Sequence, residues 1–191
     1  MHKKTGRLTI YRFYQFYYSS LDSGTSSHTQ AHFVVVAVDF GTTYSGYAFS
    51  FTRDPSEIYI MRKWDGGGDL DVNNYKTPTT LLLTPNCEFH SFGFAARDAY
   101  HNLSDKDAKR YLYFEKFKMT LHRTEHLNLD TKIKAANGQT LSAICVFAHA
   151  LRYFKHQSQR ELSDQLGAEI QDEDIRWVVT VPAIWKQTAK Q

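Results

Sequence analysis

The segment that most constrains the fold is an apolar, β-branched run that ends in an acidic residue. Phe33 to Val38 contains only Phe, Val and Ala, a composition typical of a strand buried on both faces. The run ends at Asp39, and Gly41-Thr42-Thr43 then predicts a turn. Residues 44–51 alternate small or polar residues with Tyr and Phe, which predicts a second strand. We therefore expect the two segments to pair as a β-hairpin.

Two further strands are expected before the middle of the chain. Residues 57–63 follow the Asp54-Pro55 turn, and the period of a strand places Ile58, Ile60 and Arg62 on one face, so they predict a third antiparallel strand that completes a meander. Residues 64–74 are rich in Gly, Asp and Asn and predict a loop. Residues 81–83 then predict a short strand closed by Pro85.

Helical periodicity marks the second half of the chain. Residues 95–121 carry an imperfect helical pattern interrupted at 102–105, which predicts two helices. A stronger pattern predicts one long amphipathic helix, capped by Thr140 and ending near Gly167. Its apolar positions are Leu141, Ile144, Cys145, Ala148, Leu151 and Phe154. This interpretation places Cys145 in the core as an inert thiol.

The chain closes with another strand signal. Residues 177–181 form a β-branched run that Pro182 stops, and residues 185–191 have the composition of a helix that is beginning. Strands and helices thus follow one another along the chain, which predicts the α/β class.

The composition argues against several classes of function for this chain. Apolar residues make up 42% and charged residues 23% of the 191 residues, as in soluble globular proteins. The net charge of +3 is spread along the chain and does not indicate a nucleic-acid partner. No run of apolar residues is long enough for a membrane span, so no membrane partner is expected. Cys87 and Cys145 lack any metal-type spacing, which favours reduced thiols and a cytoplasmic or nuclear location.

The turn after the first strand carries the residues best suited to chemistry. Gly41 lets backbone amides approach phosphate oxygens, and Thr42 and Thr43 can donate from both amide and hydroxyl. Asp39 can hold magnesium directly or through water. The Walker A pattern GxxxxGK[ST] is absent. A purely structural turn is the alternative for so short a pattern.

Two segments around this turn and near the end of the chain resemble signatures of one family. Asp39 to Tyr47 and Val178 to Trp185 are similar to the motifs of the heat shock 70 kDa protein family, and they occur in the same order. The resemblance extends over about residues 31–191 and is strongest to the divergent subfamily numbered twelve. The segments that carry the subfamily likeness are 45–51, 76–79, 89–98, 114–119 and 183–187.

This resemblance implies an α/β chain with the actin-like ATPase (ribonuclease H-like) fold, in which two lobes close on ATP. The chain is expected to supply the first lobe only, a mixed sheet with an antiparallel meander and flanking helices. Residues 32–191 form that lobe, residues 64–139 form a subdomain inserted in it, and the domain is expected to be truncated at residue 191. Residues 1–31 are expected to be a leader outside the core.

The resemblance also assigns roles to particular residues. The residues that match the family's first phosphate-binding segment are Asp39, Gly41, Thr42, Thr43 and Tyr44. Lys118 matches the lysine that positions the attacking water, although Lys116 is close enough to compete for this assignment. A solvated helix lysine is the alternative for either. Pro182 matches an interlobe switch, and Lys190 stands where the usual chaperones carry arginine.

The implied function is binding of ATP or ADP with magnesium as part of a chaperone-like ATPase. Little or no hydrolysis is expected of this chain by itself, because a nucleotide cleft needs two walls. Two alternatives stay open. One is a non-enzymatic adaptor that keeps the fold and acts through protein contacts, and the other is an incomplete product without a function of its own.

Two shorter motifs are set aside. His122 to His126 matches H-x-x-E-H, but charged residues flank it and no third ligand is marked, so a zinc site is not expected. Residues 69–74 begin like a calcium loop but lack the glycine and the glutamate that such a loop needs.

Overall fold

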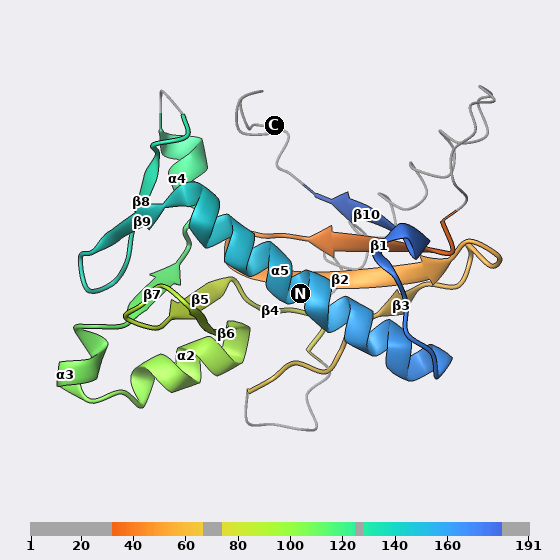
Figure 1. Cartoon of the computed structure of the whole chain (residues 1–191), viewed down its shortest axis with the longest axis horizontal. Helices are drawn as coiled ribbons and strands as arrows, with labels where there is room; N and C mark the ends of the chain where they lie inside the picture. The colour runs from red at the N-terminus through yellow and green to blue at the C-terminus, as the bar shows by residue number, and fades with distance from the viewer. Residues whose placement is uncertain (1–31, 67–73, 125–127, 181–191) are drawn as a thin grey trace, which may run out of the picture.

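The computed structural model describes residues 32–66, 74–124 and 128–180 and has the α/β architecture of Figure 1. The strands are β1 (Val34–Asp39), β2 (Tyr44–Phe51), β3 (Tyr59–Ile60), β4 (Thr77–Pro78), β5 (Thr80–Leu83), β6 (Phe89–Phe92), β7 (Leu112–Glu115), β8 (Lys132–Lys134), β9 (Thr140–Ser142) and β10 (Ile175–Val179). The helices are α2 (Gly93–His101), α3 (Asp105–Ala108), α4 (Lys118–Arg123), α5 (Ala143–Leu166) and the short 3₁₀ helix η1 (Asp172–Asp174). The predicted class, a mixed sheet with flanking helices, is confirmed.

The main sheet has the strand order β10-β1-β2-β3, and β4 pairs with the beginning of β2. β1 pairs parallel with β10 and antiparallel with β2, and Asp39 lies opposite Gly46 in the hairpin. The predicted hairpin is confirmed, with β1 extending to Asp39. The predicted third strand is much shorter than residues 57–63, because only Tyr59 and Ile60 pair with β2.

A smaller sheet, β6-β5-β7, lies beside α2 (Figure 1). The prediction that residues 95–121 form two helices is wrong in its second half, because residues 112–115 form β7 between α3 and α4. Leu112, Tyr113 and Phe114 are buried one after another and pair with β5. This pairing with a distant segment outweighs the weak local helical pattern.

Helix α5 crosses one face of the main sheet (Figure 1). It ends as predicted at Gly167, whose φ of 64° is left-handed. Its predicted beginning is wrong, since Thr140 belongs to β9 and Ser142 precedes the first helical residue. None of the described helices combines the length and the apolar character needed to cross a membrane.

The face that α5 buries also differs from the prediction. Its buried residues are Ala143, Val146, Ala150, Tyr153, Phe154, Ser158 and Leu162. Ile144 is 55% exposed, and Cys145 and Leu151 are exposed as well, so the prediction of a buried Cys145 is wrong. The large aromatic side chains at 153 and 154 decide which face packs, because they bury more apolar area than the aliphatic stripe.

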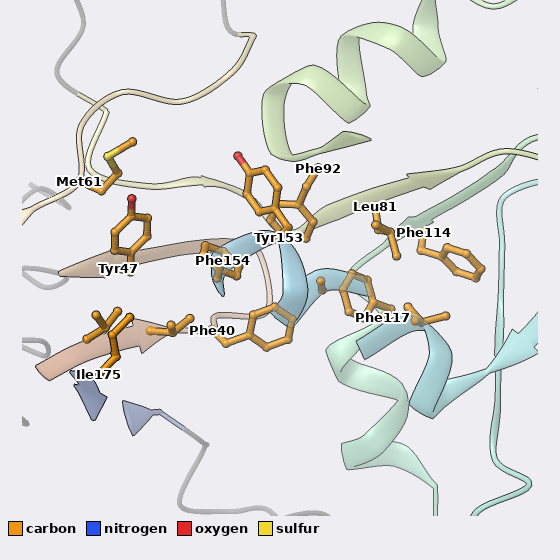
Figure 2. Close-up of a cluster of buried hydrophobic side chains, with 14 of the residues drawn as sticks. Phe40, Tyr47, Met61, Leu81, Phe92, Phe114, Phe117, Tyr153, Phe154 and Ile175 are labelled. Carbon is orange, nitrogen blue, oxygen red and sulfur yellow. The ribbon is translucent and has the colours of Figure 1, made fainter. Parts of the chain in front are cut away.

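An aromatic cluster joins α5 to the end of β1 (Figure 2). The ring of Phe40 lies 6.0 Å from that of Phe117, 5.7 Å from Phe147 and 6.1 Å from Phe154. Phe154 also packs edge-on against Tyr47. These contacts fix the residue directly after Asp39, so the turn starts from a rigid base.

The buried hydroxyl of Tyr47 offers a test of this core. Tyr47 is fully buried, and its hydroxyl has no hydrogen-bond partner among the described residues. Because an unsatisfied buried hydroxyl costs free energy, we expect Tyr47→Phe to raise the free energy of unfolding by roughly 1 kcal/mol. Phe154→Ala, in the same cluster, should lower it by about 3–5 kcal/mol. Urea denaturation measures both, and a marked loss in Tyr47→Phe contradicts this description of the core.

Candidate functional site

The candidate site lies where β1 ends and the chain turns into β2. Side chains alternate along a strand, so Phe40 enters the aromatic core while Asp39 lies on the opposite face. The parallel neighbour β10 ends at the same edge, and Thr180 follows it directly. Carboxyl ends of parallel strands are frequent ligand-binding positions in α/β proteins.

Both oxygens of the Asp39 carboxylate are engaged by protein groups. Lys76 Nζ donates to Oδ2 at 2.6 Å, and Thr180 Oγ1 donates to Oδ1 at 3.1 Å. The side chain of Asp39 is 13% exposed and that of Lys76 is 28% exposed. This ion pair is therefore partly shielded from water, which strengthens it relative to a surface pair.

Gly46 makes the approach of Lys76 possible. A Cβ atom at Gly46 would lie 2.7 Å from the Tyr75 carbonyl oxygen and 3.2 Å from Lys76 Cγ. Gly46 is also the residue opposite Asp39 in the hairpin. The missing side chain thus lets residues 75–76 pass over the strand and bring Lys76 to the carboxylate.

The turn itself is held by two buried hydroxyls. The Gly41 amide donates to Ser45 Oγ at 3.1 Å, and Thr79 Oγ1 donates to the Gly41 carbonyl at 2.8 Å. The Thr79 amide donates to the Thr43 carbonyl at 2.8 Å. A Cβ atom at Gly41 would lie 2.1 Å from the Tyr44 carbonyl oxygen, so no larger residue fits this turn.

These bonds leave the middle of the turn with unused donors. Within the described residues, the backbone amides of Thr42 and Thr43 donate to no protein acceptor. Thr43 is exposed, and Tyr44, at the start of β2, is 47% exposed. Successive free amides in a turn form a concavity that suits an anion.

Lys118 lies beside the same turn and is only 3% exposed. Its Nζ donates to the Phe40 carbonyl oxygen and lies 5.4 Å from the centre of the Phe40 ring. Burial lowers the pKa of Lys118 to about 8, and the charge of Asp39 opposes this shift. Lys116, with a left-handed φ of 49°, is exposed instead. Of the two candidate lysines, the fold brings Lys118 to the turn.

The Lys76 ammonium opposes a magnesium ion at Asp39. Its Nζ lies 2.6 Å from Oδ2, so a magnesium ion bound directly to that oxygen would have to displace Lys76. Among the described residues, no group of three or more His, Cys, Asp or Glu side chains is placed to hold a metal ion.

Comparison with known proteins identifies three similar curated proteins that belong to one family. No family profile matches the chain. The chain is 61% identical over 165 residues to "Heat shock 70 kDa protein 12A" of Homo sapiens, covering 86% of the chain and 24% of that protein. The Mus musculus protein of that name is 58% identical over 170 residues, covering 89% and 25%. "Heat shock 70 kDa protein 12B" of Homo sapiens is 57% identical over 163 residues, covering 85% and 24%.

This chain belongs to the heat shock 70 kDa protein family. The resemblance carried by its two motifs is thus confirmed, including the likeness to the members numbered twelve. The chain spans about a quarter of the length of the curated relatives it matches.

Most of the residues predicted for the site are neighbours in space in this member of the heat shock 70 kDa family. The residues that gather around the turn are Asp39, Gly41, Thr42, Thr43, Tyr44 and Lys118. Pro182 and Lys190 lie outside the described residues, and so do the predicted helix at 185–191 and the leader at 1–31. The H-x-x-E-H segment is described only in part.

Sequence reasoning missed four residues that support the site. These are Ser45, Lys76, Thr79 and Thr180, which hold the turn and the carboxylate. Lys76 and Thr79 belong to a segment used for the family resemblance, and no local pattern distinguishes them. Their partners lie 37 and 38 residues away in sequence, so only the tertiary structure reveals these contacts.

The pH dependence of stability should report on Lys118. Its pKa of about 8 in the folded chain lies below the 10.5 of an unperturbed lysine. Between these values the unfolded state binds more protons, so the free energy of unfolding should rise with pH. Lys118→Met should remove this rise, whereas Lys116→Met should keep it because Lys116 is exposed.

Urea denaturation between about pH 7.5 and about pH 9.5 measures this slope. The range stops there because burial raises the pKa of Tyr47 and Tyr153, which lowers stability once unfolded tyrosines ionise. Equal slopes in the wild-type chain and in Lys118→Met contradict the assignment of the shift to Lys118.

Proposed function

We propose that this chain forms the first lobe of an actin-like (ribonuclease H-like) ATPase domain and binds the phosphates of ATP or ADP at the turn formed by residues 39–44. One observation carries the proposal. The amides of Thr42 and Thr43, which donate to no acceptor within the part of the chain that the structure describes, and the buried ammonium of Lys118 meet at the same end of β1. The membership of the heat shock 70 kDa family supports the same ligand.

The charge of Lys118 supports an anionic ligand. Burial disfavours its ammonium, as the lowered pKa indicates, and the single carboxylate of Asp39 is shared with Lys76. A phosphate at the turn adds negative charge beside Lys118 and accepts hydrogen bonds from the Thr42 and Thr43 amides. Binding a phosphate therefore stabilises a charge that the folded chain otherwise holds at a cost.

We assign hydrolysis to the whole protein rather than to this chain. In that protein, Lys118 positions the attacking water and stabilises the charge that develops on the phosphate oxygens. Residues 32–191 act as the first lobe, with residues 64–139 as an inserted subdomain. The interlobe roles of Pro182 and Lys190, a leader at residues 1–31 and a cytoplasmic or nuclear location belong to the same proposal.

A non-enzymatic adaptor is the second candidate function. Three exposed residues on one side of α5 favour it: Ile144, Cys145 and Leu151 give this helix an apolar outer surface. Apolar groups gathered on a surface are typical of protein contacts. In this case the turn is a structural feature, and nucleotide does not bind.

Isothermal calorimetry with ATP and with ADP separates the two functions. It should be performed on this chain and on a chimera that continues it with the remaining sequence of the Homo sapiens relative 12A. We expect the chimera to bind nucleotide and this chain to bind weakly, because closure around the ligand requires a second wall. Lys118→Met should weaken binding by roughly ten- to a hundredfold, the effect of losing one charged contact.

Lys116→Met is the matched control, since it removes an exposed lysine two residues away. A second readout is proton uptake. Because the pKa of Lys118 is about 8, a bound phosphate should raise it and take up a proton near pH 8.5, seen as a dependence of the binding enthalpy on the buffer. Absence of nucleotide binding to both forms favours the adaptor.

A further inference from the structure

The turn at the end of β1 carries more positive than negative charge. Two ammonium groups, those of Lys76 and Lys118, lie beside one carboxylate, that of Asp39. Lys76 contacts the carboxylate directly, and Lys118 contacts the neighbouring Phe40 carbonyl. Side chains therefore place positive charge at this turn, as a divalent cation does at a polyphosphate site.

Lys76 is placed by the fold rather than by chance. It directly precedes β4, whose Thr77 and Pro78 pair with Ser45 and Tyr44 of β2. The absence of a side chain at Gly46 leaves the space through which Lys76 reaches the carboxylate. Strand pairing on one side and a glycine beneath it therefore hold the Lys76 backbone over the site.

The ammonium and a divalent cation compete for the same oxygen. Lys76 Nζ lies 2.6 Å from Asp39 Oδ2, and magnesium needs its own oxygen ligands at about 2.0–2.1 Å in an octahedral arrangement. An ion bound there would also face the Lys76 ammonium at close range, which is strongly unfavourable in a partly buried site. The side chain of Lys76 is 28% exposed, so it stays accessible to a ligand in the turn.

We propose that Lys76 takes the place of a protein-bound divalent cation at Asp39, so that phosphate groups bind to this turn without magnesium held by the protein. The ammonium of Lys76 neutralises Asp39 and presents its remaining donors to a phosphate oxygen, as lysines do in other phosphate sites. Any magnesium that accompanies the nucleotide is carried by its phosphates. The part of this inference that concerns phosphate rests on the proposed function.

The first test needs no nucleotide. Manganese(II) replaces magnesium at oxygen sites and broadens nearby amide resonances. We expect the amides of Gly41 and Gly46 in the isotopically labelled chain to be unaffected by Mn²⁺, and to broaden in Lys76→Met, where Asp39 is released. Lys76→Arg should behave like the wild-type chain because it keeps the cation, and Lys116→Met controls for the loss of one charge.

Equal broadening in the wild-type chain and in Lys76→Met overturns the proposal, and so does the absence of broadening in both. Dispersed amide spectra show whether each variant is folded. Lys76→Gln serves as a second variant if Lys76→Met does not fold, because it keeps a donor near Asp39 without the positive charge.

The second test measures ADP binding to the chimera by calorimetry in magnesium and in EDTA. We expect wild-type affinity to be the same in both within about threefold, and Lys76→Met to lose roughly ten- to a hundredfold of its affinity in EDTA. The inference is overturned if the wild-type chimera binds ADP only in the presence of magnesium and Lys76→Met has the same ADP affinity as the wild type. If no form binds ADP while the manganese result is as expected, the proposed function fails and the assignment of Lys76 stands.

Discussion

The packing of Phe40 into the aromatic core is the contact on which the rest of the site depends. Its ring meets Phe117, Phe147 and Phe154, and its carbonyl accepts a hydrogen bond from Lys118. Because Phe40 points inward, its neighbour Asp39 must point to the other side, toward the turn. Burial of one aromatic residue thereby fixes an acid, a lysine and the start of the turn.

The electrostatics of the site follow from this arrangement. Lys118 is brought into the interior by α4 and Phe117, where its ammonium loses water, contacts the Phe40 carbonyl and lies in the field of Asp39. Asp39 is at the same time paired with Lys76. An excess of buried positive charge is costly unless an anion compensates it. This arrangement is the physical basis for the negatively charged ligand that we propose at this edge of the sheet.

Sequence patterns were most reliable where a segment is buried on both faces or ends at a special residue. The Val-rich β1, the alternating β2 and the end of α5 at Gly167 were predicted within one residue. Sequence patterns were misleading where a segment pairs or packs with another segment that is distant in the sequence. The local pattern predicts a helix where β7 forms, because the pairing of β7 with β5 has no local signal. The buried face of α5 was assigned from aliphatic spacing, although Tyr153 and Phe154 determine it.

The sequence by itself determined the α/β class, the hairpin with its acidic turn, and the likeness to the heat shock 70 kDa family that the relatives confirm. It also singled out Asp39 and Lys118 as candidate site residues. Only the tertiary structure decided that Lys118 rather than Lys116 reaches the turn, and that Lys76 forms an ion pair with the carboxylate of Asp39. The reason is physical: local patterns encode which face of a strand or helix is apolar, whereas charge pairing depends on distances between segments far apart in the chain.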